Sequence, residues 1–335
     1  MKEDPSHKEI AVRAALDGMF SPDGKLSFSD AELLSGVSAK GERCGVVLTD
    51  KAAPFADYLQ EKLDREVPHL GARVIVNAAP KNKPTGAKPH VEKTRVPGVG
   101  RVIFVGAGKG GVGKSAVTAA LGLRMAQEGK RVALLDADIY GPSFPSMFDV
   151  RHKPKLRVET EKMIPADYKG MQIMSVGFIV ERDKALSWRG PMASKTVMQL
   201  VAGTEWSADV LIIDLPPGTG DVALSLCSHV ISDGAVVVTQ PHALSVDDAA
   251  RAGGMFAQLG IPILGVVENM ARVETGSETL YPFGQGGGEE AARKLGAPLL
   301  TSVPLYATDE GGKPFLRMAR EFPEATIDKI CHSFH

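Results

Sequence analysis

Residues 101–116 read RVIFVGAGKGGVGKSA, an apolar run followed by a glycine-rich stretch and a lysine–serine pair. The apolar run predicts a buried strand, and KSAVTAALGLRMAQEG, at 114–129, predicts a helix that stops at Gly129. A glycine loop between a strand and a helix N-terminus suits phosphate groups, because the N–H groups of the loop point at the anion. The stretch therefore predicts a nucleotide-binding α/β domain.

Two motifs occupy this loop, and they predict different ligands. The dinucleotide fingerprint G-x-G-x-x-G falls on Gly106, Gly108 and Gly111, and the P-loop pattern G-x-x-x-x-G-K-S falls on Gly108, Gly113, Lys114 and Ser115. A dinucleotide site needs close backbone approach and no cation, whereas a P-loop uses its lysine on the β- and γ-phosphates and its serine hydroxyl on Mg²⁺. The lysine–serine pair favours the P-loop. A nicotinamide oxidoreductase and a glycine turn that binds nothing are the alternatives, which a nucleotide-binding assay distinguishes.

A P-loop enzyme also needs a carboxylate for the metal at the end of a second strand. The run VLIIDLPPGTGD supplies Asp214 directly after apolar residues, and we expect Asp214 and Ser115 to hold Mg²⁺. Two further carboxylates, Asp136 and Asp138, end the predicted strand RVALLDAD. We expect Asp136 to reach the metal through water and Asp138 to orient the attacking water, because paired carboxylates beside phosphate are unfavourable without such a use. The alternative for one of them is a turn or helix cap.

Other contacts to the nucleotide are expected from the loop and from two later segments. Gly218, in the glycine-containing loop after Asp214, is expected to touch the γ-phosphate through its N–H group. Asn269, in VVENMAR, suits the adenine amino group, and Arg272 stands where a guanine site would need a carboxylate, so we expect ATP rather than GTP. The alternative is that Asn269 only closes the turn after its strand. The expected loop residues are Gly108, Lys109, Gly110, Gly111, Val112, Gly113, Lys114, Ser115 and Ala116.

The sequence divides into three parts. Residues 1–80 have the pattern of a small α/β domain, with helical spacing in HKEIAVRAALDGMF and AAPFADYLQEKLDREV and strand-like runs in ERCGVVLTD and ARVIVNAA. Residues 81–97 are rich in proline and lysine and predict a linker. Residues 98–335 alternate strands and helices, and near-continuous apolar runs such as VLIIDLPP and GAVVVTQP are typical of a parallel sheet buried on both faces. We predict a doubly wound, mostly parallel sheet.

Composition favours a cytoplasmic protein without a membrane or nucleic-acid partner. The 335 residues carry a net charge of −1, so overall charge indicates neither nucleic acid nor an anionic membrane. The N-terminus MKEDPSHKEI lacks the apolar segment of a signal peptide, and no uninterrupted apolar run of about 18 residues occurs. The three cysteines, Cys44, Cys227 and Cys331, are far apart in sequence, which argues against a disulfide framework.

The motifs resemble those of the Mrp/ApbC family of P-loop ATPases, whose wider group includes the cell-division protein MinD and the partition ATPases of the ParA type. The similar segments are GKGGVGKS, LLDADIYGPS, WRGPM, LIIDLPPGTGD, VENM and FGQGGGEEAARKLGAPLL, and the similarity extends from about residue 98 to 320. Residues 1–80 resemble a degenerate copy of the small domain that often precedes the ATPase domain.

The resemblance implies a role for Lys109, the extra lysine at the front of the loop. In these ATPases two subunits face each other across their nucleotides, and the front lysine of one reaches the phosphates bound by the other. Lys109 is thus expected to act in trans, much as an arginine finger does, with Lys114 and Asp138 as the other catalytic residues. The resemblance implies a Mg²⁺-dependent ATPase that works as a homodimer. The alternative for Lys109 is a solvated surface lysine.

Two departures from the family pattern bear on function. Ala116 stands where the family usually has threonine, which removes a hydroxyl donor to the α-phosphate and about 1 kcal/mol of binding. Mrp-type proteins are viewed as iron–sulfur cluster carriers with a C-x-x-C pair between ENM and FG, but ENMARVETGSETLYPFG contains no cysteine. Cys227 is expected to pack as a small hydrophobe.

The expected function is therefore ATP hydrolysis in the service of iron–sulfur cluster assembly or transfer, with scaffold or client proteins as partners. Whether the chain itself holds a [4Fe–4S] cluster is left open by the missing cysteine pair, since cluster irons are bound by thiolates. The alternative is a positioning or scaffold ATPase of the MinD or ParA kind, which pelleting with liposomes and with DNA distinguishes.

Overall fold

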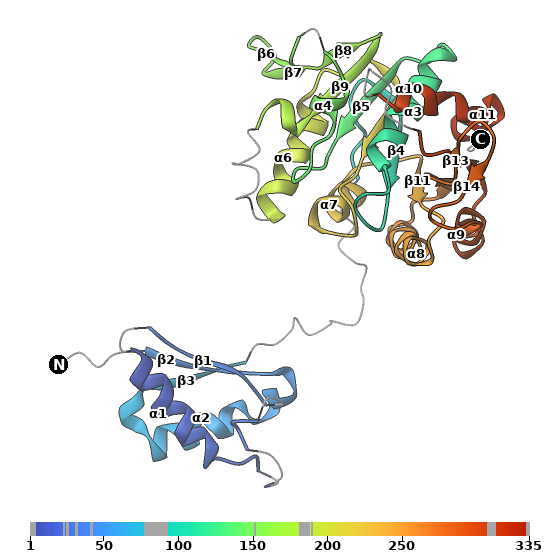
Figure 1. The fold of residues 1–335 in the computed structure, drawn as a ribbon. Helices are drawn as coiled ribbons and strands as arrows, with labels where there is room; N and C mark the ends of the chain where they lie inside the picture. Colours follow the sequence, from blue (N-terminus) through green and yellow to red (C-terminus); the bar gives the residue numbers. More distant parts are fainter. Residues whose placement is uncertain are drawn as a thin grey trace. The chain divides into compact units, whose positions relative to one another are not determined.

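The computed structural model describes residues 5–22, 24, 27–30, 33–40, 43–76, 93–150, 152–180, 188, 190–306 and 313–332. The chain divides into two compact units, residues 1–90 and 91–335 (Figure 1). Most of the predicted linker, 81–97, lies outside the described residues. Its last residues, 93–97, belong to the second unit, where the Thr94 N–H donates to the His229 carbonyl at 2.7 Å.

In its described residues, the first unit is a three-stranded sheet with two α-helices. The strand order is β1-β2-β3, with β1 and β2 antiparallel and β2 and β3 parallel. Leu16, Val46 and Leu59, from a helix, a strand and the second helix, are fully buried in one shared core. The elements are α1 (Pro5–Asp17), β1 (Leu34–Lys40), β2 (Arg43–Leu48), η1 (Asp50–Phe55), α2 (Ala56–Glu66), η2 (Pro68–Leu70) and β3 (Ala72–Val76).

The second unit is built on one eight-stranded sheet with the order β15-β12-β11-β4-β10-β5-β9-β8. Every neighbouring pair is parallel except β8 and β9. The strands are β4 (Val99–Gly106), β5 (Val132–Asp136), β8 (Ala166–Tyr168), β9 (Met171–Ser175), β10 (Ala208–Asp214), β11 (Gly234–Thr239), β12 (Ile263–Glu268) and β15 (Leu299–Ser302). The predicted mostly parallel sheet is confirmed. Two small hairpins lie outside it, β6 (Lys155–Arg157) with β7 (Lys162–Ile164) and β13 (Val273–Glu274) with β14 (Thr279–Leu280).

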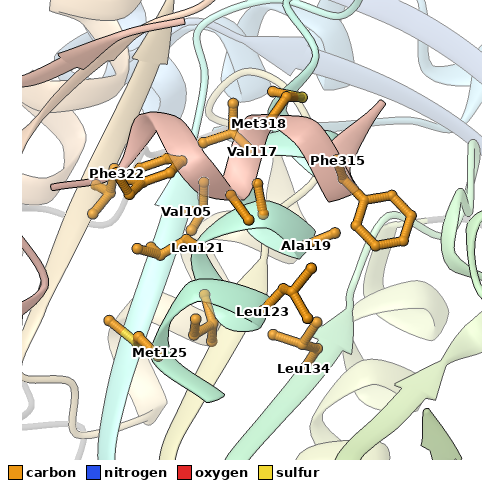
Figure 2. Close-up of a cluster of buried hydrophobic side chains, with 14 of the residues drawn as sticks. Val105, Val117, Ala119, Leu121, Leu123, Met125, Leu134, Phe315, Met318 and Phe322 are labelled. Carbon is orange, nitrogen blue, oxygen red and sulfur yellow. The ribbon is translucent and has the colours of Figure 1, made fainter. Parts of the chain in front are cut away.

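Helices cover both faces of this sheet, so it is doubly wound. Successive residues of β4 point into different cores, Ile103 and Val105 into one and Val102 and Phe104 into the other. Figure 2 shows the first core, where α3 packs beneath Phe315 and its neighbours. The helices are α3 (Lys114–Gln127), α4 (Phe144–Met147), η3 (Val176–Phe178), α6 (Gly190–Gly203), α7 (Asp221–His229), α8 (Ala243–Gln258), α9 (Gly287–Leu295), α10 (Phe315–Met318), η4 (Ala319–Glu321) and α11 (Glu324–His332).

Three central strands end side by side and bring the glycine loop and two carboxylates together. Strand β4 runs into the loop, and the register pairs Asp214, at the end of β10, with Val105 of β4 and with Asp136 at the end of β5. Ligands of open α/β sheets bind outside the carboxyl ends of the strands, so this edge is where a ligand is expected. Within the described ranges, no helix has the length and apolar character needed to cross a membrane.

Candidate nucleotide-binding site

The glycine loop is held in shape by close backbone packing. Gly113 precedes α3 in a left-handed conformation, with φ of 81°, and a Cβ atom there would lie 2.2 Å from Asn269 Nδ2. A Cβ atom on Gly108 would lie 1.9 Å from the carbonyl oxygen of Asp248 on α8. A side chain is therefore excluded at Gly113 by conformation and by space, and at Gly108 by space, which fixes the loop against Asn269 and α8.

A cavity of about 550 Å³ opens above this loop. The cavity-lining residues that were expected from the sequence are Lys109, Gly110, Gly111, Val112, Gly113, Lys114, Ser115, Ala116 and Asp138. The remaining wall comes from Gly141, Pro142, Ser143, Ser146, Met147 and Pro217. The volume and the loop N–H groups suit a nucleoside polyphosphate. Five expected site residues do not line it, namely Gly108, Asp136, Asp214, Gly218 and Asn269.

The base of the site is a cluster of polar side chains around Asp214. Lys114 Nζ lies 2.7 Å from Asp214 Oδ1, and the Ser115 hydroxyl donates to Oδ2 at 2.5 Å. Thr118 donates its hydroxyl to Oδ1 at 2.8 Å. Asp214 and Lys114 are buried, with exposed fractions of 0% and 6%, so each charge compensates the other. The Ser115 and Asp214 oxygens are the hard donors that Mg²⁺ prefers, and they fit the metal role expected for them.

Thr118 was not singled out in the sequence. It lies one turn after Lys114 on α3 and is completely buried. The available signal was its spacing of four residues from the lysine, which puts both side chains on one face of the helix.

Asp136 is an internal anchor rather than a wall of the cavity. Its carboxylate accepts hydrogen bonds from the N–H groups of Asp138, Ser143 and Phe144 and from the Ser175 hydroxyl, at 2.9–3.1 Å. The side chain is fully buried, and these donors surround both oxygens. In the structure this carboxylate holds the start of α4, the cap role named as the alternative, and the expectation that Asp136 reaches the metal through water stays a prediction.

The pKa of Asp136 makes the stability of the second unit depend on pH. Burial, and then the charge of Asp214, raise the pKa of Asp136 from 3.8 to about 7. Between about pH 4 and about pH 7 the folded chain keeps a proton that the unfolded chain releases, so the free energy of unfolding should fall as pH rises through this window. In Asp136→Asn this fall in the free energy of unfolding between about pH 4 and about pH 7 should be absent, whatever the absolute stability of the variant.

Tryptophan fluorescence during urea unfolding, without nucleotide or Mg²⁺, measures this dependence, because both tryptophans, Trp188 and Trp206, lie in the second unit. Asp209→Asn is the control, since Asp209 is an exposed carboxylate whose pKa is lowered by its hydrogen bond with Arg131. The control should keep the fall in stability between about pH 4 and about pH 7. An equal fall in Asp136→Asn and in the wild type would refute the assignment.

Asp138 and Lys109 both face the cavity with little to restrain them. The Asp138 carboxylate accepts from the Gly141 N–H at 3.1 Å, and partial burial raises its pKa. Lys109 is half-buried, and no hydrogen bond or ion pair joins it to any other described residue. These placements leave a carboxylate and an ammonium group free to meet a substrate.

Gly218 and Asn269 have intramolecular partners where contacts to nucleotide were expected. The Gly218 N–H donates to the Ala107 carbonyl at 2.9 Å, so it is not free for a γ-phosphate. Asn269 is buried and donates its amide to the Val112 carbonyl at 2.8 Å. Asn269 thus holds the glycine loop in place. Gly218 joins the segment after β10 to Ala107, the residue that follows β4.

The glycine run at 284–288, which the sequence left without a role, positions α9. A Cβ atom on Gly287 would lie 2.3 Å from the Pro241 carbonyl oxygen, so only glycine permits this approach. The Gly288 N–H donates to Glu268 at 2.8 Å, and the Ser302 hydroxyl donates to the other oxygen of that buried carboxylate at 2.8 Å. In the WRGPM segment, a Cβ atom on Gly190 would lie 2.0 Å from Asp221 Oδ2, so the first residue of α6 lies beside the first residue of α7.

The cysteines do not form a cluster site in the described residues. Cys44 and Cys227 are buried in the cores of different units, and burial raises the pKa of Cys227 to about 12. The Cys331 side chain is outside the described residues. The hairpin β13–β14 stands where the resemblance places a cysteine pair, and it is closed by a hydrogen bond from the Thr275 N–H to the Glu278 carbonyl at 3.0 Å. Among the described residues no three of the types His, Cys, Asp and Glu are grouped to hold a metal ion.

Several known proteins with similar sequences are named iron–sulfur cluster carrier or transfer proteins. The family model for ParA-type NUBPL iron-transfer P-loop NTPases matches residues 98–333. An iron–sulfur cluster carrier protein of Rickettsia felis is 36% identical over 280 residues, covering 82% of this chain and 84% of that protein. One from Synechocystis is 34% identical over 333 residues, covering 95% and 93%. The iron–sulfur cluster transfer protein NUBPL of Dictyostelium discoideum is 37% identical over 246 residues, covering 71% and 76%.

Two solved structures with a similar fold are a nucleotide-binding protein and a cell division ATPase. A nucleotide-binding protein of Archaeoglobus fulgidus, solved in complex with ADP, has a TM-score of 0.53 and 31% identity, and covers 72% of this chain and 91% of its own. The cell division ATPase MinD of Pyrococcus furiosus has a TM-score of 0.50 and 22% identity, covering 69% and 97%. The second likeness concerns the fold alone.

Proposed function

Because the chain belongs to the family of iron-transfer P-loop NTPases, we propose that it is a Mg²⁺-dependent ATPase that acts as a homodimer in iron–sulfur cluster assembly or transfer. The observation that carries this proposal is the cluster of Lys114, Ser115 and Asp214 beneath the P-loop cavity. Its donors combine a cation for phosphate with oxygen ligands for a metal. We infer scaffold or client proteins as partners in a cytoplasmic setting, and neither nucleic acid nor membrane.

Each residue at the cavity has a distinct proposed role. Lys114 binds the β- and γ-phosphates, and the loop N–H groups bind the remaining phosphate oxygens. Ser115 and Asp214 would hold Mg²⁺, which neutralises the developing charge on the phosphates. Asp138 accepts a hydrogen bond from the attacking water and orients it towards the γ-phosphate.

The homodimer is supported by what surrounds the loop. Tyr140 is 43% exposed on the rim of a cavity that adjoins the nucleotide cavity at Asp138 and Pro217. Leu244 is 65% exposed on α8. It lies one turn before Asp248, the residue against which Gly108 packs. Exposed apolar groups beside a charged site favour a protein contact there. A second copy on this face would bring its own Lys109 to the phosphates.

Relatives of this chain are named iron–sulfur cluster carriers, but this chain lacks the cysteine pair expected to bind the cluster. A bridging cluster would give about four irons per dimer. After anaerobic reconstitution with iron and sulfide, the iron content of the purified protein should therefore stay well below that value, with little absorbance at about 400 nm. Cys227 cannot supply a thiolate without leaving the core. Stoichiometric iron that is lost in Cys227→Ala would contradict this expectation.

A gain-of-function variant is the matched control. T275C/E278C creates the C-x-x-C spacing in the β13–β14 hairpin, where the two backbones are already joined by a hydrogen bond. Two such pairs across a two-fold axis would supply four thiolates. Iron uptake by this variant and not by the wild type would show that only the ligands are missing. Mg²⁺-ATP hydrolysis in both proteins tests the enzymatic part of the proposal.

A further inference from the structure

We propose that Thr118 is the residue that positions Asp214 for the metal when nucleotide and Mg²⁺ bind together. The proposal rests on the proposed function, since it concerns how the same site takes up its substrate. It starts from the Lys114–Asp214 ion pair, in which the two groups expected to bind phosphate and metal bind each other.

The ion pair occupies both ligand positions before any ligand arrives. Lys114 Nζ is 2.7 Å from Asp214 Oδ1, and the exposed fractions of the two side chains are 7% and 0%. When Lys114 moves to a phosphate, Asp214 is left as a buried carboxylate without a cation, which is strongly unfavourable. When Mg²⁺ arrives alone, it meets the ammonium group at the same carboxylate. Binding both together exchanges one cation for another, so each ligand should strengthen the other.

Thr118 stays at Asp214 through this exchange. Its hydroxyl lies 2.8 Å from Asp214 Oδ1 and 3.0 Å from the Lys114 carbonyl oxygen, and its side chain is fully buried. Thr118 does not line the nucleotide cavity. After Lys114 leaves, the hydroxyl still holds Oδ1, and Oδ2 remains turned towards the Ser115 hydroxyl, where the metal is expected. Thr118 therefore acts through Asp214 and not on the nucleotide.

Calorimetry of ATP binding, with Mg²⁺ and with EDTA, measures the coupling directly. Wild-type protein should bind ATP at least about 100-fold more weakly in EDTA, because metal-free ATP must break a buried ion pair. Asp214→Asn releases Lys114 from that pair, so it should bind metal-free ATP at least about 10-fold more tightly than the wild type, and Mg²⁺ should then change the affinity by less than about threefold.

Asp221→Asn separates this mechanism from simple charge repulsion. Asp221 is a carboxylate on the wall of the adjoining cavity and not of the nucleotide cavity. If the ion pair controls binding, this variant changes metal-free ATP binding by less than about threefold. An equal gain in Asp221→Asn and Asp214→Asn would overturn it. So would equal wild-type affinities in Mg²⁺ and EDTA, which would leave the proposed ATPase intact. A complete absence of ATP binding under both conditions would refute the proposed function itself.

The role of Thr118 is tested by substitutions of matched shape. Thr118→Val keeps the branched shape without the hydroxyl, and it should reduce the Mg²⁺ enhancement of ATP binding about 10-fold while leaving affinity in EDTA within about twofold. Thr118→Ser keeps the hydroxyl and should retain the enhancement. Thr118→Ala, which adds no bulk, should follow the valine variant. Equal enhancement in the serine, valine and alanine variants, or an equal loss of affinity with and without Mg²⁺, would overturn the positioning role.

Discussion

Replacement of Lys114 with alanine is expected to weaken ATP binding at least about a thousandfold and to destabilise the nucleotide-free protein at the same time. The first effect follows from the loss of the cation that the P-loop aims at the β- and γ-phosphates. Calorimetry with Mg²⁺-ATP measures it, and near-normal affinity would refute the assignment of the loop. The second effect follows from the position of Lys114 in the structure, where it neutralises the buried Asp214.

The loss of stability should be large because one half of a buried pair is removed. Breaking such a pair by truncating one partner costs about 3–5 kcal/mol, since the remaining charge is uncompensated. K114A/D214N removes both charges, so it should recover most of the free energy of unfolding and none of the ATP binding. Tryptophan fluorescence follows unfolding of the second unit. A double variant as unstable as Lys114→Ala would show that the ion pair is not the cause.

The sheet could be predicted where strands are apolar at every position. Strands β5 and β11 are buried along their whole lengths, and their sequences are continuous runs that favour a parallel sheet covered on both faces. Strand β1, Leu34–Lys40, was not predicted, because LSGVSAK carries a glycine and serines and pairs through a register shift. The short strands β6 to β8 have too few residues for a period to appear.

The sequence predicts those site residues that belong to short motifs, but not the contacts between residues far apart in the chain. Lys114 and Ser115 follow from the loop motif, and Asp214 follows from its place after a buried strand. The bond from Asn269 to the Val112 carbonyl joins residues 157 positions apart, and that from Thr118 to Asp214 joins residues 96 apart. No motif records such pairs, because the sheet order decides which strand ends become neighbours.

Asp136 shows why a residue type at a strand end does not fix its role. Its neighbour but one, Asp138, faces the cavity, whereas Asp136 turns inward and is enclosed by donors from β9 and the start of α4. Both positions satisfy the same sequence pattern. Only the path of the chain after β5 determines which carboxylate meets the ligand and which holds the backbone.

Lys109→Ala is expected to keep ATP binding within about threefold of the wild type and to lose at least about a hundredfold in turnover. Lys109 lies at the cavity without an ion pair to any described residue, so its removal leaves no buried charge and should not destabilise the fold. A positive charge brought to the phosphates from a partner would act mainly on the transition state. Turnover within about twofold of the wild type, equivalent to about 0.4 kcal/mol, would contradict the catalytic role.

Mixing two inactive variants shows whether this lysine acts on its own nucleotide or on that of a second copy. Lys109→Ala subunits bind ATP but lack the lysine, and K114A/D214N subunits keep Lys109 but bind no ATP. If Lys109 acts across the dimer, a mixed dimer has one complete site, formed by the nucleotide of the first subunit and the lysine of the second. Random pairing of equal amounts makes half of the dimers mixed, each with one site of two, so about a quarter of wild-type turnover per chain should return. Hydrolysis measured against the mixing ratio tests this, and turnover that stays at the level of the separate variants would mean that Lys109 does not act in trans.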